Sequence, residues 1–163
     1  LQSANNNPWI VTACNNGLCK IWDSASNQFT HQFFHAKEHS VHMDTCAVFN
    51  SNDRMIITAT QDGSCKIWDV RKLGEKHPLK SFSVHSGVNR LAISSYHSRF
   101  CVATNKRQAK IYDLSGKCLE TLQKQGHDMM VTGACWSEDG ENVFSCSADR
   151  SIIQWRVGYN EGS

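Results

Sequence analysis

Four short segments of this chain repeat one pattern at a nearly constant spacing. The copies read TACNNGLCKIWD at 12–23, TATQDGSCKIWD at 58–69, VATNKRQAKIYD at 102–113 and SCSADRSIIQWR at 145–156. Their aromatic residues lie 43 to 46 positions apart, at Trp22, Trp68, Tyr112 and Trp155. A period of this length indicates an array of similar supersecondary units, each stacked on the next. The repeat therefore limits the fold more strongly than any other feature of the sequence.

Each repeat has the pattern of short strands joined by tight turns. In the second copy, alternating apolar residues at 54–60 and 64–69 flank the polar turn Gln61-Asp62-Gly63, which is typical of a β-hairpin. The flanking runs extend this to four strands per repeat: 44–50, 54–60, 64–69 and 79–84 in the second, and 88–94, 99–104, 108–113 and 118–123 in the third. No helix-length window has a 3.6-residue period. An all-β chain with about 40 to 45 residues per four strands is expected to form propeller blades.

The repeats resemble the WD repeats of the WD-repeat β-propeller family over about residues 9 to 157. The fourth copy is the most complete, with Gly126-His127 at its start and Ser145, Asp149 and Trp155 following. In that family, the His, Ser or Thr, Asp and Trp form a hydrogen-bonded chain that ties the loop before the first strand to the blade. A buried indole N–H, hydroxyl and imidazole each need a partner, so such a network fixes one packing of the blade.

The other copies depart from this pattern to different degrees. The second keeps Thr58, Asp62 and Trp68, and we assign its histidine to His39, one of four closely spaced histidines: His31, His35, His39 and His42. The third has Lys106 and Tyr112 in place of the Asp and Trp, so we expect no network there. The first has Asn16 in place of Asp.

The expected strands do not complete a ring. The blades span 9–34 without an innermost strand, 44–84, 88–123, and 131–157 without a closing strand, which makes fourteen strands and about three and a half blades. Propellers close rings of roughly four to eight blades and thereby remove open edges. The favoured explanation is that the chain is the C-terminal half of a ring of about seven blades, completed by the rest of the same protein. Two copies could instead pair into a ring, or unusual segments could supply the missing strands.

Composition excludes several classes of partner. The net charge of +2 makes no basic footprint for nucleic acid, no apolar stretch has the length of a membrane helix, and the start lacks the features of a secretory signal. The eight cysteines contain no Cys-x-x-Cys and mostly lie in apolar runs, and the chain has no N-glycosylation sequon. We therefore expect reduced thiols and a cytoplasmic or nuclear location.

No motif points to catalysis or to a cofactor. The chain lacks a nucleophile elbow, a phosphate-binding glycine loop and a His-Glu-x-x-His helix. The four histidines at 31–42 would converge on a metal only if they lay on a helix, and this segment leaves a strand for a loop. We expect neither enzyme activity, nor a metal site, nor a cofactor.

One local stretch resembles a docking box. Residues 56–71, IITATQDGSCKIWDVR, are similar to the box with which WD-repeat substrate receptors contact the adaptor of cullin-4 ubiquitin ligases. The resemblance implies that Arg71 contacts the adaptor, supported by Asp62 and Asp69. The blade itself also requires the Ile, Thr, Asp and Trp of this stretch, so only Arg71 adds information, and an ordinary blade is the favoured interpretation.

The remaining candidates come from the face on which a propeller gathers its loops. The family resemblance implies contact positions on this top face, together with Asn15: Met43, Thr45, Gln61, Gly87, Asn89, Asn105, Met130, Thr132 and Ala148. These residues are small, polar and uncharged apart from two methionines, which suits a protein or peptide better than a phosphate backbone. Lys106 and Arg107, at a turn tip, could contact an acidic partner, although a solvated turn is favoured. The sequence predicts a non-enzymatic binding scaffold in a multiprotein complex, with a cullin-4 substrate receptor as the alternative.

Overall fold

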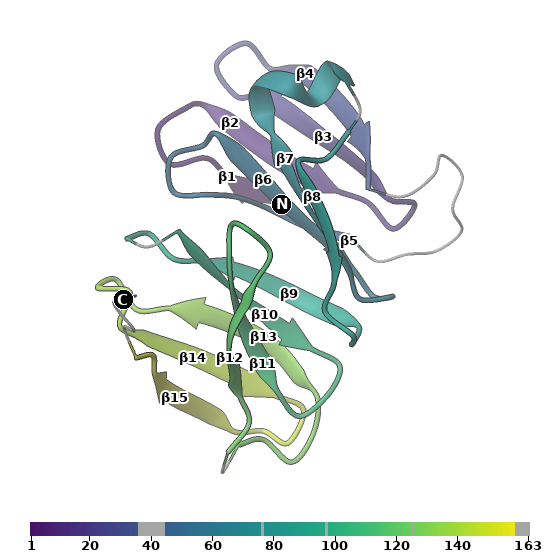
Figure 1. Cartoon of the computed structure of the whole chain (residues 1–163). Helices are drawn as coiled ribbons and strands as arrows, with labels where there is room; N and C mark the ends of the chain where they lie inside the picture. Colours follow the sequence, from purple (N-terminus) through teal and green to yellow (C-terminus); the bar gives the residue numbers. More distant parts are fainter. Residues whose placement is uncertain (36–44, 76, 97, 125, 159–163) are drawn as a thin grey trace.

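The chain folds into four antiparallel sheets that lie side by side, as the computed structural model in Figure 1 shows. The structure describes residues 1–35, 45–75, 77–96, 98–124 and 126–158. The first sheet contains β1 (Gln2–Ser3), β2 (Trp9–Ala13), β3 (Leu18–Asp23) and β4 (Gln28–Phe34). The second contains β5 (Thr45–Phe49), β6 (Met55–Thr60), β7 (Ser64–Asp69) and β8 (Lys80–Ser83). The third contains β9 (Val88–Ile93), β10 (Arg99–Thr104), β11 (Ala109–Asp113) and β12 (Cys118–Leu122), and the fourth β13 (Val131–Trp136), β14 (Asn142–Ser147) and β15 (Ile152–Arg156).

Strands follow one another across each sheet in chain order, and most consecutive strands are joined by short turns. The first strands of the later sheets are neighbours, with β5 beside β9 and β9 beside β13. The predicted repeating β unit is confirmed.

Two elements differ from the sequence prediction. The first sheet has a fourth strand, β1, in which Gln2 pairs with Val11 and Ser3 with Ile10, so the predicted three strands of this blade must be corrected. The two-residue strand carries no alternation signal, and the side chain of Gln2 holds it in place by accepting the N–H of Phe49 in the second sheet at 2.6 Å. The second difference is a 3-10 helix, η1 (Val70–Glu75), after β7. In the described residues the fourth sheet has three strands, as predicted.

Neighbouring sheets share apolar cores because alternate residues of a strand point to opposite faces. Ile56 packs with Phe33 and Trp68 between the first two sheets, whereas the adjacent Ile57 packs with Phe100 between the second and third. Both isoleucines are fully buried. A strand buried on both faces must be apolar at consecutive positions, which explains the near-continuous apolar run of β6.

The outer face of the fourth sheet is partly apolar. It carries a shallow hollow of about 470 Å³ whose lining includes Cys135, Phe144, Cys146 and Ile152. Ile152 is 75% exposed. The expectation that further strands of a ring cover this face stays a prediction.

Turns and loops at one end of the sheets form what we call the top face. Its members are the turns at 14–17, 61–63, 105–107 and 148–150 and the described loop residues 84–87, 123, 124 and 126–130. At the β6–β7 turn, Gly63 has a φ of 85°, and a Cβ there would lie 2.7 Å from the carbonyl oxygen of Ser86. Only glycine allows this turn to approach the loop before β9 so closely. Within the described residues, no helix has the length and apolar character to cross a membrane.

Candidate functional site

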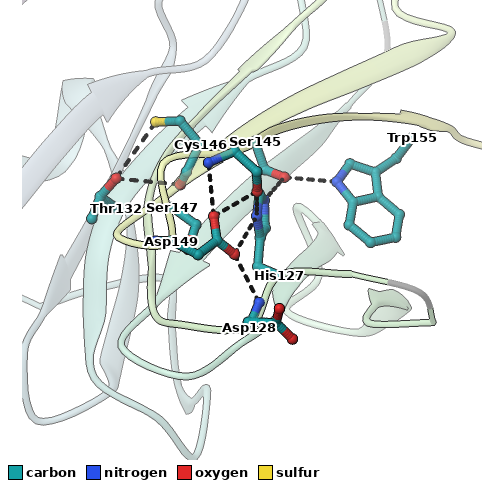
Figure 2. Close-up of polar contacts among 9 residues, drawn as sticks. His127, Asp128, Thr132, Ser145, Cys146, Ser147, Asp149 and Trp155 are labelled. Carbon is teal, nitrogen blue, oxygen red and sulfur yellow. Dashed lines mark hydrogen bonds and ion pairs between the residues drawn. The ribbon is translucent and has the colours of Figure 1, made fainter.

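A chain of hydrogen bonds ties the loop before β13 to the fourth sheet (Figure 2). Trp155 donates its indole N–H to the Ser145 hydroxyl at 2.7 Å, and that hydroxyl lies 2.7 Å from Nε2 of His127. Nδ1 of His127 lies 2.8 Å from the hydroxyl of Ser151. Because the Ser151 hydroxyl donates its proton to Asp149, it accepts a hydrogen bond from Nδ1 of His127. The side chains that the resemblance grouped here are thus in contact.

Asp149 closes this network. Its carboxylate accepts the hydroxyl of Ser151 at 2.5 Å, the backbone N–H of Ser151 at 2.8 Å and the backbone N–H of Asp128 at 2.7 Å. These hydrogen bonds hold the pKa of Asp149 well below its usual value, and the bond from the Ser151 hydroxyl has the largest effect. The carboxylate therefore joins the β14–β15 turn to the loop before β13.

The second sheet has a longer relay. Trp68 donates to Thr58 at 2.8 Å, Thr58 lies 2.6 Å from Nδ1 of His35, and Nε2 of His35 lies 2.6 Å from the Ser64 hydroxyl. The relay continues through Thr60 to Asp62, with distances of 2.7 Å for Ser64 to Thr60 and 2.5 Å for Thr60 to Asp62. It runs from a buried indole to a carboxylate in an exposed turn.

The histidine of this relay is His35, and the assignment to His39 must be corrected. His39 and His42 lie outside the described residues, whereas His31 is exposed on β4. His35 precedes its hydroxyl partner by 23 residues and His127 precedes its own by 18, so a longer loop shifts the spacing. Burial, with a smaller contribution from Lys66, lowers the pKa of His35 to about 4. The ring is therefore neutral at pH 7.

The first and third sheets anchor their aromatic residues differently. In the third, Val102 stands where the others have a hydroxyl, and Tyr112 packs between Phe82 and Phe100, with ring centroids 5.2 and 5.7 Å away. In the first, Trp22 donates to Thr12 at 3.1 Å. Asn16 there accepts the N–H of Leu18 at 3.0 Å, the turn contact that Asp62 makes with Ser64 in the second sheet.

The structure divides the predicted top-face residues into two groups. Asn15, Thr45, Gln61 and Asn89 line a common hollow of about 360 Å³. The side-chain amide of Asn89 also donates to the carbonyl of Val131 at 2.7 Å, which joins the third sheet to the fourth. Met43 lies outside the described residues.

The second group makes contacts with neighbouring turns and strands. Gly87 is buried, and a Cβ there would lie 2.5 Å from the carbonyl oxygen of Gln61 and 2.7 Å from the amide nitrogen of Asn105. Asn105 accepts the Ser86 hydroxyl at 2.8 Å. Farther along, the N–H of Ala148 donates to the carbonyl of Met130 at 3.1 Å, and Thr132 donates to the carbonyl of Cys146 at 3.3 Å.

Two of the three predicted docking residues come together, and the third lies apart from them. Asp62 lies in the β6–β7 turn, whereas Asp69 ends β7 and Arg71 belongs to η1 at the other end of the sheet. Arg71 donates to both carboxylate oxygens of Asp69, from Nε at 3.0 Å and from Nη2 at 2.7 Å. Hydrogen bonds from Arg71 lower the pKa of Asp69 to about 2. The Arg71 side chain is nevertheless 73% exposed, so the carboxylate holds an outward-facing guanidinium in one orientation.

Comparison with known proteins settles the family. The family described as "WD domain, G-beta repeat" matches residues 1–23, 28–69, 76–113 and 116–156. The chain belongs to the WD-repeat family. The predicted membership is confirmed, and we refer to the four sheets in chain order as blades 1 to 4. Proteins built from these repeats are generally non-catalytic scaffolds that bind other proteins.

Relatives of the chain carry only a repeat-based name. It is 31% identical over 160 residues to "WD repeat-containing protein 37" of Xenopus laevis and 29% identical to the Homo sapiens protein of the same name. Each match covers 91% of this chain and 30% of the relative, so the chain spans less than a third of their length.

An anchor between blades 1 and 2 was not anticipated from the sequence. The carboxylate of Asp53, only 2% exposed, accepts the backbone N–H of Asn5 at 2.8 Å and that of Asn6 at 2.5 Å. Asp53 itself has a φ of 57°, a left-handed conformation that Asp tolerates better than most residues. The run Asn5-Asn6-Asn7 was the available signal, but its partner is far away in sequence.

The cysteine thiols and the metal-ligating side chains of the described residues are the groups from which a reactive or metal-binding centre would be built. All eight cysteines lie in the described part of the chain, and each is a free thiol. Burial raises the pKa of Cys19 and Cys101 to about 12, which keeps these thiols protonated and unreactive. Across the described ranges, no three His, Cys, Asp or Glu side chains are placed to hold a metal ion.

Proposed function

We propose that the chain is a non-enzymatic scaffold that binds protein or peptide partners on its top face, as part of a multiprotein complex. The observation that carries the proposal is the hollow lined by Asn15, Thr45, Gln61 and Asn89, which gathers residues from blades 1, 2 and 3. Its lining offers amide and hydroxyl groups beside small apolar ones, a mixture that suits peptide backbone and side chains.

Contacts between described residues support this proposal because they hold parts of the top face in place. His127 ties the loop before blade 4 to that blade, and Gly87 packs directly against Gln61. A surface that is ordered before binding loses less conformational entropy when a partner arrives. Rigidly held loops are also where binding residues concentrate.

Blocking the hollow tests the proposal. Asn15→Arg and Gln61→Arg each place a long, charged side chain at its rim, and both positions are exposed turn residues. Proteins that co-purify with the wild type should be lost from both variants. The control is Ser98→Arg, an equally exposed change in the β9–β10 turn at the opposite end. If the co-purified proteins are the same in all four samples, the top face is not the binding surface.

A cullin-4 substrate receptor is a second candidate function. Support comes from Arg71, whose guanidinium is exposed yet held by two hydrogen bonds to Asp69, as an interface anchor requires. Arg71→Ala should abolish adaptor pull-down without changing the urea unfolding midpoint, whereas Lys72→Ala, the neighbouring exposed cation, should leave it intact. Adaptor binding that survives Arg71→Ala rejects this role.

The location and the completion of the ring are also proposals. Eight free thiols support a reducing cytoplasmic or nuclear compartment, which imaging of the tagged full-length protein would test. The partly apolar outer face of blade 4 supports a ring completed by other blades of the same protein. Light scattering distinguishes this from pairing of two copies, because two chains of 18.3 kDa each would double the measured mass.

A further inference from the structure

The described residues of the loop before β13 form hydrogen bonds to two turns of the top face. The His127 side chain enters the network of blade 4, and the N–H of Asp128 donates to Asp149. The carbonyl of Met130 accepts the N–H of Ala148 at 3.1 Å, and the N–H of Val131 donates to the carbonyl of Lys106 at 3.0 Å. The loop is therefore fixed against the β14–β15 turn on one side and the β10–β11 turn on the other.

This fixed loop exposes two adjacent large apolar side chains. Met129 is 51% exposed and Met130 is 45% exposed. Hydrogen bonds of the Asp128 N–H, the Met130 carbonyl and the Val131 N–H hold the backbone on both sides of Met129. Methionine is flexible and polarisable, and so adapts to apolar partners of different shape. Held in this way, the pair presents a ready apolar contact.

Positive charge lies on both sides of the methionine pair. Lys106 and Arg107 are exposed in the β10–β11 turn, where the ammonium group of Lys106 also donates to the carbonyl of His85 at 3.4 Å, and Arg150 is exposed in the β14–β15 turn with a φ of 70°. Two carboxylates lie beside these three cations: Asp149, which accepts three hydrogen bonds, and Asp128, which is exposed. The corresponding turns of blades 1 and 2 are formed by Asn15-Asn16-Gly17 and Gln61-Asp62-Gly63, so among these four turns Lys and Arg occur only in blades 3 and 4.

We propose that the surface formed by Met129, Met130, Lys106, Arg107 and Arg150 binds an acidic protein segment that carries an apolar residue. The apolar residue contacts the methionine pair, and carboxylates on either side of it face the three cations. Burial of the apolar contact provides affinity, whereas charge complementarity provides selectivity and fast association. A nucleic acid fits this surface less well, because phosphate contacts require a longer run of cations than three residues around an apolar centre. This inference rests on the proposed function, since it names the partner class for part of the same face.

Peptide selection against the purified protein tests the partner class directly, because a random library contains acidic, neutral and basic candidates alike. A displayed library of random 12-residue peptides is selected on wild type, and the enriched sequences are synthesised with a fluorescent label for anisotropy titrations. The expected result is enrichment of Asp and Glu around one apolar residue. Raising the salt concentration should weaken binding of these peptides, because exposed charge pairs are screened.

Matched variants locate the site. The double variant Lys106→Glu/Arg107→Glu should weaken the acidic peptides by more than about tenfold, and Met130→Ser by about tenfold, since each removes a central contact. The control double variant Arg54→Glu/Lys72→Glu makes the same change in charge at exposed positions of the opposite end and should leave affinity unchanged. Urea unfolding of each variant checks that the fold is retained.

The outcomes separate this inference from the general function. If the selected peptides compete with one another for the top face but are neutral or basic, the acidic partner class is wrong while the scaffold proposal stands. If acidic peptides bind equally well to Lys106→Glu/Arg107→Glu, the inference is also overturned. If no selected peptide depends on any top-face residue, both proposals fail.

Discussion

Replacing Thr58 by Val removes one hydroxyl from the centre of the blade 2 relay without changing the size of the side chain much. The hydroxyl accepts the indole N–H of Trp68 and donates to Nδ1 of His35. The three residues are 0%, 2% and 1% exposed, respectively, so water cannot replace the lost bonds. The variant therefore leaves a buried donor and a buried acceptor without partners.

The expected destabilisation follows from these two groups. Each unsatisfied buried polar group costs about 1 to 3 kcal/mol, so the two groups together should lower the free energy of unfolding of Thr58→Val by about 2 to 6 kcal/mol. Thr12→Val in blade 1 is the matched control, because it removes the same hydroxyl from a Trp22 contact that is only partly buried. Its cost should stay below about 1 kcal/mol, since water can satisfy the indole there.

Urea unfolding followed by tryptophan fluorescence and circular dichroism measures both values. A double-mutant cycle with Trp68→Phe sharpens the test, because the Phe variant has no indole N–H to leave unsatisfied. The two changes should then be non-additive, with Thr58→Val costing less in the Phe background. A Thr58→Val cost similar to that of Thr12→Val, or strict additivity in the cycle, would refute the view that the relay stabilises the blade.

Three further predictions follow from burial and close contact. His35 has a pKa of about 4 in the folded protein against 6.5 ordinarily, so the unfolded chain takes up the proton at a higher pH than the folded protein does. The contribution of His35 to stability is complete above about pH 6.5, and the free energy of unfolding should fall by roughly 2 to 3 kcal/mol as the pH drops towards 4. Urea unfolding at several pH values measures this decrease, and a His35→Asn variant should lack it. Gly87→Ala places a Cβ too close to neighbouring atoms and should lower the free energy of unfolding by about 1 to 3 kcal/mol. Gly74→Ala should be nearly neutral, because a Cβ there would have no atom within 4 Å. Equal urea unfolding midpoints for the two variants would contradict this. In the native protein, Cys118 should react with a disulfide reagent far faster than the buried Cys101, which mass spectrometry of the labelled peptides would measure; equal labelling would show that the fold opens readily.

Local patterns in the sequence were sufficient for the strands. The predicted strand at 54–60 corresponds to β6 (Met55–Thr60), and that at 88–94 corresponds to β9 (Val88–Ile93). Alternation and turn residues are properties of neighbouring positions, so they are visible without tertiary information. β1 was missed because two residues carry no period, and its place depends on Gln2 reaching Phe49 in the next blade.

The same limit explains the histidine. The repeat period indicated where a network histidine belongs, and it identified His127 where the loop has the ordinary length. Before blade 2 the loop is longer, so distance along the chain no longer indicates distance in space. Which of four histidines enters the blade was decided by the position of Thr58 and Ser64, on strands that follow 20 or more residues later.

By itself, the sequence determined the repeating unit, its four-strand pattern and its membership of the WD-repeat family, because periodicity, turns and the hydroxyl-to-Trp spacing are all encoded locally. Only the tertiary structure decided what each surface residue does. Gly87 turned out to be packed, Met129 exposed, and Asp62 and Arg71 to lie at opposite ends of a strand. Exposure and partners arise from contacts between blades, and such contacts join residues that no local pattern connects.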